Sequence, residues 1–114
     1  MEVIWSDLAL QQLDAVVDYV EENFGVLTAR KTLRKILEKT DSLAVYSEHG
    51  IFDAKFTSLV AKRQMEIRHL LIVPNSIYYL LDEDKVVIIG IAYVKQSPRV
   101  VTSMIKRFLE HYDS

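Results

Sequence analysis

From residue 10 onward, apolar side chains recur at alternating spacings of three and four, which predicts a narrow apolar stripe along one face of a helix. The stripe consists of Leu10, Leu13, Val17, Val20 and Phe24. Ser6 is a favourable N-cap for this helix, and Gly25 stands where glycine commonly ends one. A short apolar run over residues 2–5 precedes the helix and predicts a strand.

The same spacing continues after Gly25 and predicts a second helix that begins near Leu27 or Thr28. Its stripe consists of Ala29, Leu33, Ile36, Thr40 and Leu43. Two helices with such stripes and a short glycine-containing link form an antiparallel hairpin that lies on a sheet.

Residues 65–94 are dense in Ile, Val, Leu and Tyr, which predicts three consecutive strands. Pro74-Asn75 interrupts the run first, and the polar residues 82–85 interrupt it again. Connections this short can join only antiparallel neighbours, so we expect an antiparallel meander. Ser97 and Pro98 then mark the start of a last helix that ends near His111. Residues 51–64 alternate poorly and are expected to form a loop with a short strand or helical turn.

These elements predict an α+β fold of order β-α-α-β-β-β-α in a single domain over residues 1–114. With 50% hydrophobic and 26% charged residues, a chain of 114 residues should fold around one core. It has no cysteine, which excludes disulfides and zinc sites of the cysteine type. No apolar run approaches a membrane span and the first residues do not resemble a signal peptide, so we expect a cytoplasmic protein that does not enter a membrane.

The net charge of −2 argues against a sequence-independent polyanion binder, although the predicted second helix is locally basic. Its cations align at i, i+4 and are Arg30, Lys31, Arg34, Lys35 and Lys39. They are either a phosphate-contacting ridge or a solvated face balanced by acidic residues of the first helix, Asp14, Asp18, Glu21 and Glu22. We favour the balanced face, because like-charge pairs at this spacing cost only a few tenths of a kcal/mol.

Alternation along residues 65–73 places Glu66 and Arg68 on one face of a strand and His69 on the other. Arg68 within an apolar strand is costly unless it is paired, so it either forms an ion pair with Glu66 or anchors a phosphate or a partner's carboxylate. His69 is expected to be a partly buried structural residue rather than a catalytic one. The three histidines have no spacing typical of a metal site. Tyr78 and Tyr79 are neighbours and must face opposite sides, one in the core and one exposed.

Several landmarks, taken in order, resemble the RelE/ParE superfamily of bacterial toxin–antitoxin toxins. Trp5-Ser6, followed by Ala9, Leu13 and Tyr19, looks like the opening motif of the family. Ala29 and Gly50 are similar to conserved landmarks of its middle part, and Arg68-His69-Leu70 resembles its R-x-L strand. Ser76-Ile77-Tyr78-Tyr79 resembles the Y-R-I-x-Y strand, and Val94-Lys95-Gln96-Ser97 resembles the basic tail of the last strand.

Two departures bear on the mechanism. Ser76 and Gln96 stand where RelE-type ribonucleases carry arginine, which leaves Lys95 as the cation of that corner. The chain therefore resembles the ParE branch, which lacks that nuclease set and acts on DNA gyrase. This resemblance implies a toxin of a type II (plasmid stabilisation) module that inhibits growth by binding a protein target. It implies no enzyme activity, no cofactor and no metal, and a cognate antitoxin as partner, in a groove beside the hairpin and the open sheet face.

Three points stay open. A RelE-like, ribosome-dependent mRNA endoribonuclease with a reduced site would use Arg68 and Lys95, with either His69 or Lys62 as a further residue. A degenerate family member would have no toxicity. Partner or phosphate binding is expected of Glu66, Arg68, Lys95, Lys62 and Arg63. A homodimer and a toxin–antitoxin heterotetramer are both compatible with the sequence.

Overall fold

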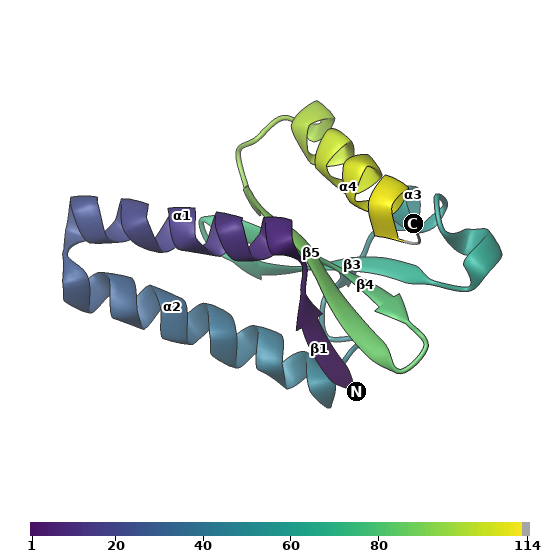
Figure 1. Cartoon of the computed structure of the whole chain (residues 1–114), viewed down its shortest axis with the longest axis horizontal. Coiled ribbons are helices and arrows are strands. Elements are labelled where there is room, and N and C mark those ends of the chain that lie inside the picture. The colour runs from purple at the N-terminus through teal and green to yellow at the C-terminus, as the bar shows by residue number, and fades with distance from the viewer. Residues whose placement is uncertain (113–114) are drawn as a thin grey trace.

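The computed structural model describes residues 1–112 and has a sheet with helices on both faces (Figure 1). A helical hairpin covers one face, and a C-terminal helix with a short helix beside it covers the other. The elements are β1 (Glu2–Trp5), α1 (Asp7–Phe24), α2 (Val26–Asp41), η1 (Ser42–Ala44), β2 (Ile51–Phe52), α3 (Ala54–Thr57), η2 (Ala61–Arg63), β3 (Glu66–Ile72), β4 (Asn75–Asp82), β5 (Lys85–Tyr93) and α4 (Pro98–Tyr112).

The predicted α+β layout is confirmed, and the sheet is wider than the meander alone. Its strand order is β1-β5-β4-β3-β2, with β3, β4 and β5 antiparallel as expected. β1 pairs in parallel with β5, from Glu2 opposite Lys85 to Trp5 opposite Ile88, so the sheet is mixed. β2 adds a two-residue edge in the segment where a short strand or helical turn was expected.

The predicted helix ends are confirmed by their hydrogen bonds. Ser6 caps α1, because its Oγ accepts the amide of Ala9 at 3.0 Å, and the same hydroxyl donates to the carbonyl of Ile89 at 2.9 Å. Gly25 joins α1 to α2 with a φ of 91°, a conformation that side chains disfavour. α4 begins at Pro98 as predicted and runs to Tyr112, one residue beyond the expected end.

Two apolar clusters hold the layers together. The hairpin cluster lies between α1, α2 and one sheet face, with Ile36, Leu43, Ile77, Tyr79 and Ile88 fully buried. The second cluster lies on the opposite face, where Ile67, Leu80 and Ile89 pack against α4 through Val101 and Ile105. Alternate residues of each strand feed the two clusters, as the pleat of a strand requires.

The hairpin extends well beyond the sheet, which gives the molecule dimensions of 45 × 31 × 25 Å (Figure 1). The apolar stripe predicted for α1 is therefore covered only in part. Leu13 is buried, whereas Phe24 at the distal end is 64% exposed. Leu10, in the first turn, is 46% exposed for another reason: the neighbouring Ala9, which is fully buried, takes the place in the buried face that the stripe assigned to Leu10. Among residues 1–112, no helix combines the length and apolar character that a membrane crossing needs.

Candidate functional site

Arg68 ties the segment before β2 to the sheet. Its Nε donates to Oε2 of Glu66 at 2.9 Å, so the ion pair anticipated from the spacing forms. Its Nη1 donates to the carbonyls of Gly50 at 2.9 Å and Glu48 at 3.2 Å, and its guanidinium lies over the ring of Phe52. The Arg68 side chain is 15% exposed, and its contacts within the chain are those of a structural tie.

Tyr79 holds the same segment, the one before β2, through its hydroxyl group. It is fully buried, and its hydroxyl donates to the carbonyl of Ser47 at 2.7 Å and accepts the amide of Gly50 at 2.9 Å. A Cβ on Gly50 would lie 2.5 Å from that hydroxyl, so the close approach requires glycine. Burial raises the pKa of Tyr79. This Tyr79–Gly50–Arg68 cluster fixes the connection between α2 and β2.

His69 lies on the opposite face of β3, as the alternation predicts, and it is partly buried. Its Nδ1 is 2.8 Å from Oδ2 of Asp53, and the two side chains are 16% and 17% exposed. Its ring lies 5.2 Å from that of Tyr78, and Phe56 packs edge-on against the same tyrosine. Burial raises the pKa of Tyr78, and the carboxylate of Asp53 raises it further. Asp53 could not be predicted as the partner of His69, because it is 16 positions away, in the segment with the weakest pattern.

The remaining candidate cations are spread over the molecule. Lys62 and Arg63 lie in η2, just before β3 begins. Lys95 is exposed in the turn after β5, at the end of the sheet where β3 leads into β4. Arg68 and His69 face opposite sides of β3, so the structure does not bring Arg68, Lys95 and His69 into one site. Within residues 1–112, no cluster of His, Asp or Glu could hold a metal ion.

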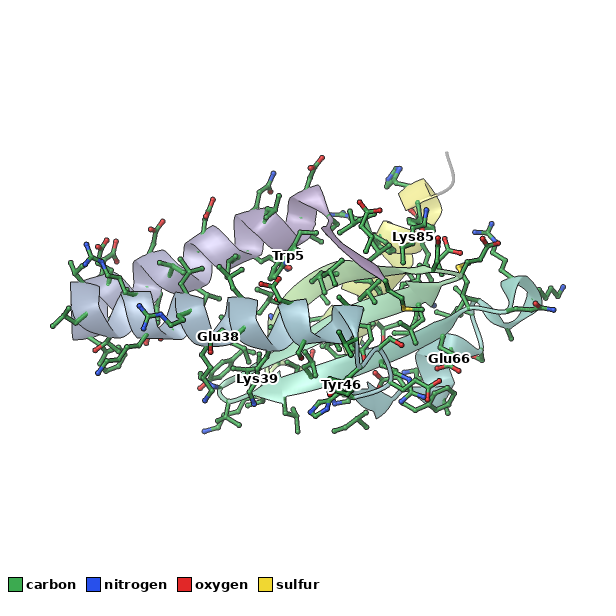
Figure 2. All side chains as sticks on the ribbon, turned by 90° about the horizontal axis from the view of Figure 1, so that it is seen from below. Trp5, Glu38, Lys39, Tyr46, Glu66 and Lys85 are labelled. Atoms are coloured by element: carbon green, nitrogen blue, oxygen red, sulfur yellow. The ribbon has the colours of Figure 1, made fainter. Side chains whose placement is uncertain are left out.

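The basic row on α2 is exposed, as expected of a solvated face. Within the described residues 1–112, no ion pair joins the cations of α2 to acidic residues of α1. Figure 2 shows α2 lying over the strands, with Lys39 on the side of the helix that faces them. The row is thus open to an external partner.

A large apolar groove of about 1080 Å³ lies between the hairpin and the end of the sheet. The distal half of α1 lines one wall with Val16, Tyr19, Val20 and Phe24. The floor and the far wall come from the ends of β3, β4 and β5, with Ile72, Val73 and Ile91 among them. We call this concavity the hairpin groove. It exists because the apolar stripes of the hairpin continue where the sheet stops.

The relation to known proteins agrees with this architecture. The sequence profile described as "ParE toxin of type II toxin-antitoxin system, parDE" matches residues 3–98. The chain belongs to the ParE toxin family. The hairpin, the meander and the hairpin groove of this ParE-family chain all lie within the matched residues.

A solved structure supports the fold of the ParE-family chain independently. It is titled "Chromosomal ParDE TA system from P. aeruginosa" and superposes with a TM-score of 0.65 at 22% sequence identity. The match covers 82% of this chain and 95% of the other. Among curated proteins, no sequence matches this one.

Proposed function

We propose that this chain is the toxin of a type II toxin–antitoxin module, that it inhibits a protein target such as DNA gyrase, and that a cognate antitoxin neutralises it. The observation that carries this proposal is the hairpin groove on a ParE-family fold. Apolar concavities on a protein surface commonly bind a partner or a ligand. An antitoxin segment, helical or extended, fits such a groove.

The rim of the hairpin groove supports a protein partner rather than a small ligand. Phe24 is 64% exposed and Tyr19 is 60% exposed, and both line the groove. Large aromatic side chains of this kind provide much of the binding energy at protein interfaces. A partner that covers these side chains would stabilise the complex by roughly 25 cal/mol for each Å² of apolar surface removed from water.

The groove part of the proposal is tested by co-expression with the product of the adjacent open reading frame, followed by size-exclusion chromatography. A stable complex is expected, and its mass distinguishes a heterodimer from a heterotetramer. Phe24→Ala should weaken the complex about tenfold or more, because an aromatic anchor is lost. Tyr46→Ala is a matched control, since Tyr46 is 66% exposed but lies outside the groove. The absence of any complex would contradict the proposal.

The target is tested separately by supercoiling of relaxed plasmid with purified gyrase. We expect inhibition at a stoichiometric excess of toxin and relief when the antitoxin is added. Growth arrest on induction, and better retention of an unstable plasmid carrying the module, are the expected cellular effects. Action on gyrase requires the toxin to be in the cytoplasm, and we include that location in the proposal. Unaffected supercoiling would remove gyrase as the target and leave the antitoxin part intact.

One observation favours a second candidate, a ribosome-dependent endoribonuclease. The Asp53–His69 pair holds an imidazole in a fixed orientation, which is the arrangement a general base requires. Against it, the Arg68 guanidinium is already bound to Glu66 and two carbonyls on the other face, away from any phosphate near His69. Primer extension after in vitro translation discriminates: codon-positioned cuts that His69→Ala abolishes would favour the nuclease.

A further inference from the structure

Positive charge is concentrated in the last part of the chain. Residues 95–109 hold four basic residues, Lys95, Arg99, Lys106 and Arg107, and no acidic one, whereas the whole chain has a net charge of −2. Segregation of charge of this kind is typical of a region that binds a polyanion. The last three of these cations lie in α4, beyond the residues 3–98 that the ParE profile matches.

The fold turns these three cations toward solvent. α4 lies on the sheet face opposite the hairpin and packs against it through Val101 and Ile105 (Figure 1). At about 3.6 residues per turn, Arg99, Lys106 and Arg107 lie on the other side of the helix, and all three are exposed. Among residues 1–112, none of them has an ion-pair partner. We call these three residues the basic face of α4.

A groove of about 600 Å³ runs beside the basic face. The start of α1 lines it with Leu8 and Gln12, and α4 lines it with Ser103, Lys106 and Arg107 among others. Ser103 is exposed, and its hydroxyl has no hydrogen-bond partner in residues 1–112. An ammonium, a guanidinium and a hydroxyl on one wall are the donors that commonly bind phosphate oxygens.

The aromatic rings of α4 are not placed beside these cations. Phe108 and Tyr112 stack on each other at 5.2 Å and pack against the cluster under α4, and the Tyr112 hydroxyl donates to Asp82. Single-stranded nucleic acid binds by stacking its bases on exposed rings, and protein partners rely on aromatic anchors and seldom on lysine. The backbone of a duplex needs only cations and hydroxyls.

From this arrangement we infer that the basic face of α4 binds the phosphodiester backbone of duplex DNA without reading its sequence. The inference rests on the proposed function and adds a partner to it. A toxin that inhibits gyrase meets duplex DNA on its target, and contacts with that DNA strengthen its binding to the assembly. Three cations give modest affinity, so we expect a Kd of about 10–100 µM for duplex DNA alone in dilute salt.

The contact is tested by fluorescence anisotropy with a labelled duplex of about 20 base pairs at several salt concentrations. A plot of log K against log salt concentration should have a slope of about −3, because each phosphate contact contributes about −0.9. The triple variant Arg99→Gln, Lys106→Gln and Arg107→Gln should bind about tenfold more weakly or worse and lose most of this slope. Circular dichroism should show native helix content, since glutamine is a good helix former. Wild-type protein that does not bind the duplex would overturn the inference.

The matched control lies on α2. Arg30→Gln, Lys31→Gln and Arg34→Gln remove the same charge from exposed positions and should weaken DNA binding less than about threefold. A loss equal to that of the α4 variant would overturn the assignment to the basic face. Glu110→Gln removes the acidic residue that lines the groove and should tighten binding about two- to threefold, a gain that misfolding cannot produce. Unchanged or weaker binding of Glu110→Gln would overturn the groove as the path of the backbone.

The identity of the partner is tested with two further ligands. We expect duplex DNA to bind more tightly than a single strand of the same length, and the α4 triple variant to bind the product of the adjacent open reading frame as tightly as the wild type does. Tighter binding of the single strand would overturn the duplex. A loss of antitoxin binding with unchanged DNA binding would assign the basic face to a protein partner and overturn the inference.

Supercoiling assays separate failure of the inference from failure of the proposed function. The α4 triple variant should require about threefold more protein than the wild type to inhibit gyrase, while its complex with the antitoxin stays intact. Inhibition by a wild-type protein that shows no DNA binding would overturn the DNA contact and leave the proposed function standing. DNA binding through α4 without any inhibition of gyrase would support the contact and remove gyrase as the target.

Discussion

The two halves of the helical hairpin have the same sequence pattern and different environments. In the proximal half, Ala9, Leu13 and Ile36 are buried against the sheet. In the distal half, Phe24 of the α1 stripe is 64% exposed, and the apolar side chains of Tyr19 and Leu27, outside the stripes, are 60% and 73% exposed. There the hairpin continues past the sheet (Figure 1). The apolar stripe alone therefore does not decide burial; the length of the sheet does. The distal half retains apolar surface that this chain does not itself cover.

The contrast between the two halves of the hairpin predicts that they contribute unequally to the free energy of unfolding. Ile36→Ala in the proximal half should lower the free energy of unfolding by about 2–5 kcal/mol, because it leaves a cavity in a fully buried site. Leu27→Ala in the distal half should change it by no more than about 0.5 kcal/mol. Urea denaturation of both variants measures the difference. Similar losses would mean that the distal half is packed in solution.

The proximal half also depends on the buried hydroxyl of Tyr79. Tyr79→Phe should cost about 1–3 kcal/mol, because the Gly50 amide and the Ser47 carbonyl lose a buried partner. Tyr78→Phe is the matched control on the opposite face, since the Tyr78 hydroxyl has no hydrogen-bond partner in residues 1–112. Equal thermal shifts of the two variants would contradict the role assigned to Tyr79.

The pH dependence of stability is a second test of the buried Tyr79 hydroxyl. The pKa of Tyr79 is raised above its ordinary value of 10.0, with burial as the largest cause. Its stabilising contribution is complete below that value and is lost as pH rises through the folded-state pKa, because only the unfolded chain ionises easily. Above pH 10, the wild type should therefore lose stability more steeply than Tyr79→Phe. The free energy of unfolding of both proteins is measured by urea denaturation across this pH range. An equal fall with pH in the two proteins would contradict the role assigned to the Tyr79 hydroxyl.

The smallest effect is expected on the exposed face of the distal half. Lys31→Glu replaces a like-charge pair with an attractive one to Lys35 and should stabilise the protein by about 0.3–0.5 kcal/mol. The gain should vanish in 1 M salt, where surface charges are screened. Denaturation at low and high salt measures it. A larger, salt-independent gain would indicate contacts that α2 does not make in this structure.

Much of the fold followed from local rules. The spacing of the apolar stripes, Ser6, Gly25 and Pro98 predicted the helices, because caps and periodicity act over a few residues. The parallel pairing of β1 with β5 did not follow, since four residues give no signal for a distant partner. Boundaries were good to a residue or two, as at the start of α2.

The candidate site was predicted less completely, and for a physical reason. Glu66 and Arg68 are two positions apart, so their pairing was visible, whereas the carbonyls of Glu48 and Gly50 are backbone groups of an irregular segment. Asp53 was missed beside His69 because nothing in that segment fixes its direction. A groove for a partner was expected from the family resemblance. The residues that line the groove depend on where the hairpin extends beyond the sheet. That position is set by how two elements pack together, so neither element's sequence predicts it alone.

The pairing of β1 with β5 also sets an order of events during synthesis. Glu2 leaves the ribosome early, but its partner Lys85 follows much later in the chain. The α1–α2 hairpin can form before β1 pairs with β5, because this non-local pairing requires both strands to have been synthesised. The hairpin groove needs Ile91 as well as α1, so it too is absent until β5 has emerged. The proposed binding surface for the antitoxin is therefore complete only after residues 85–93 have been made.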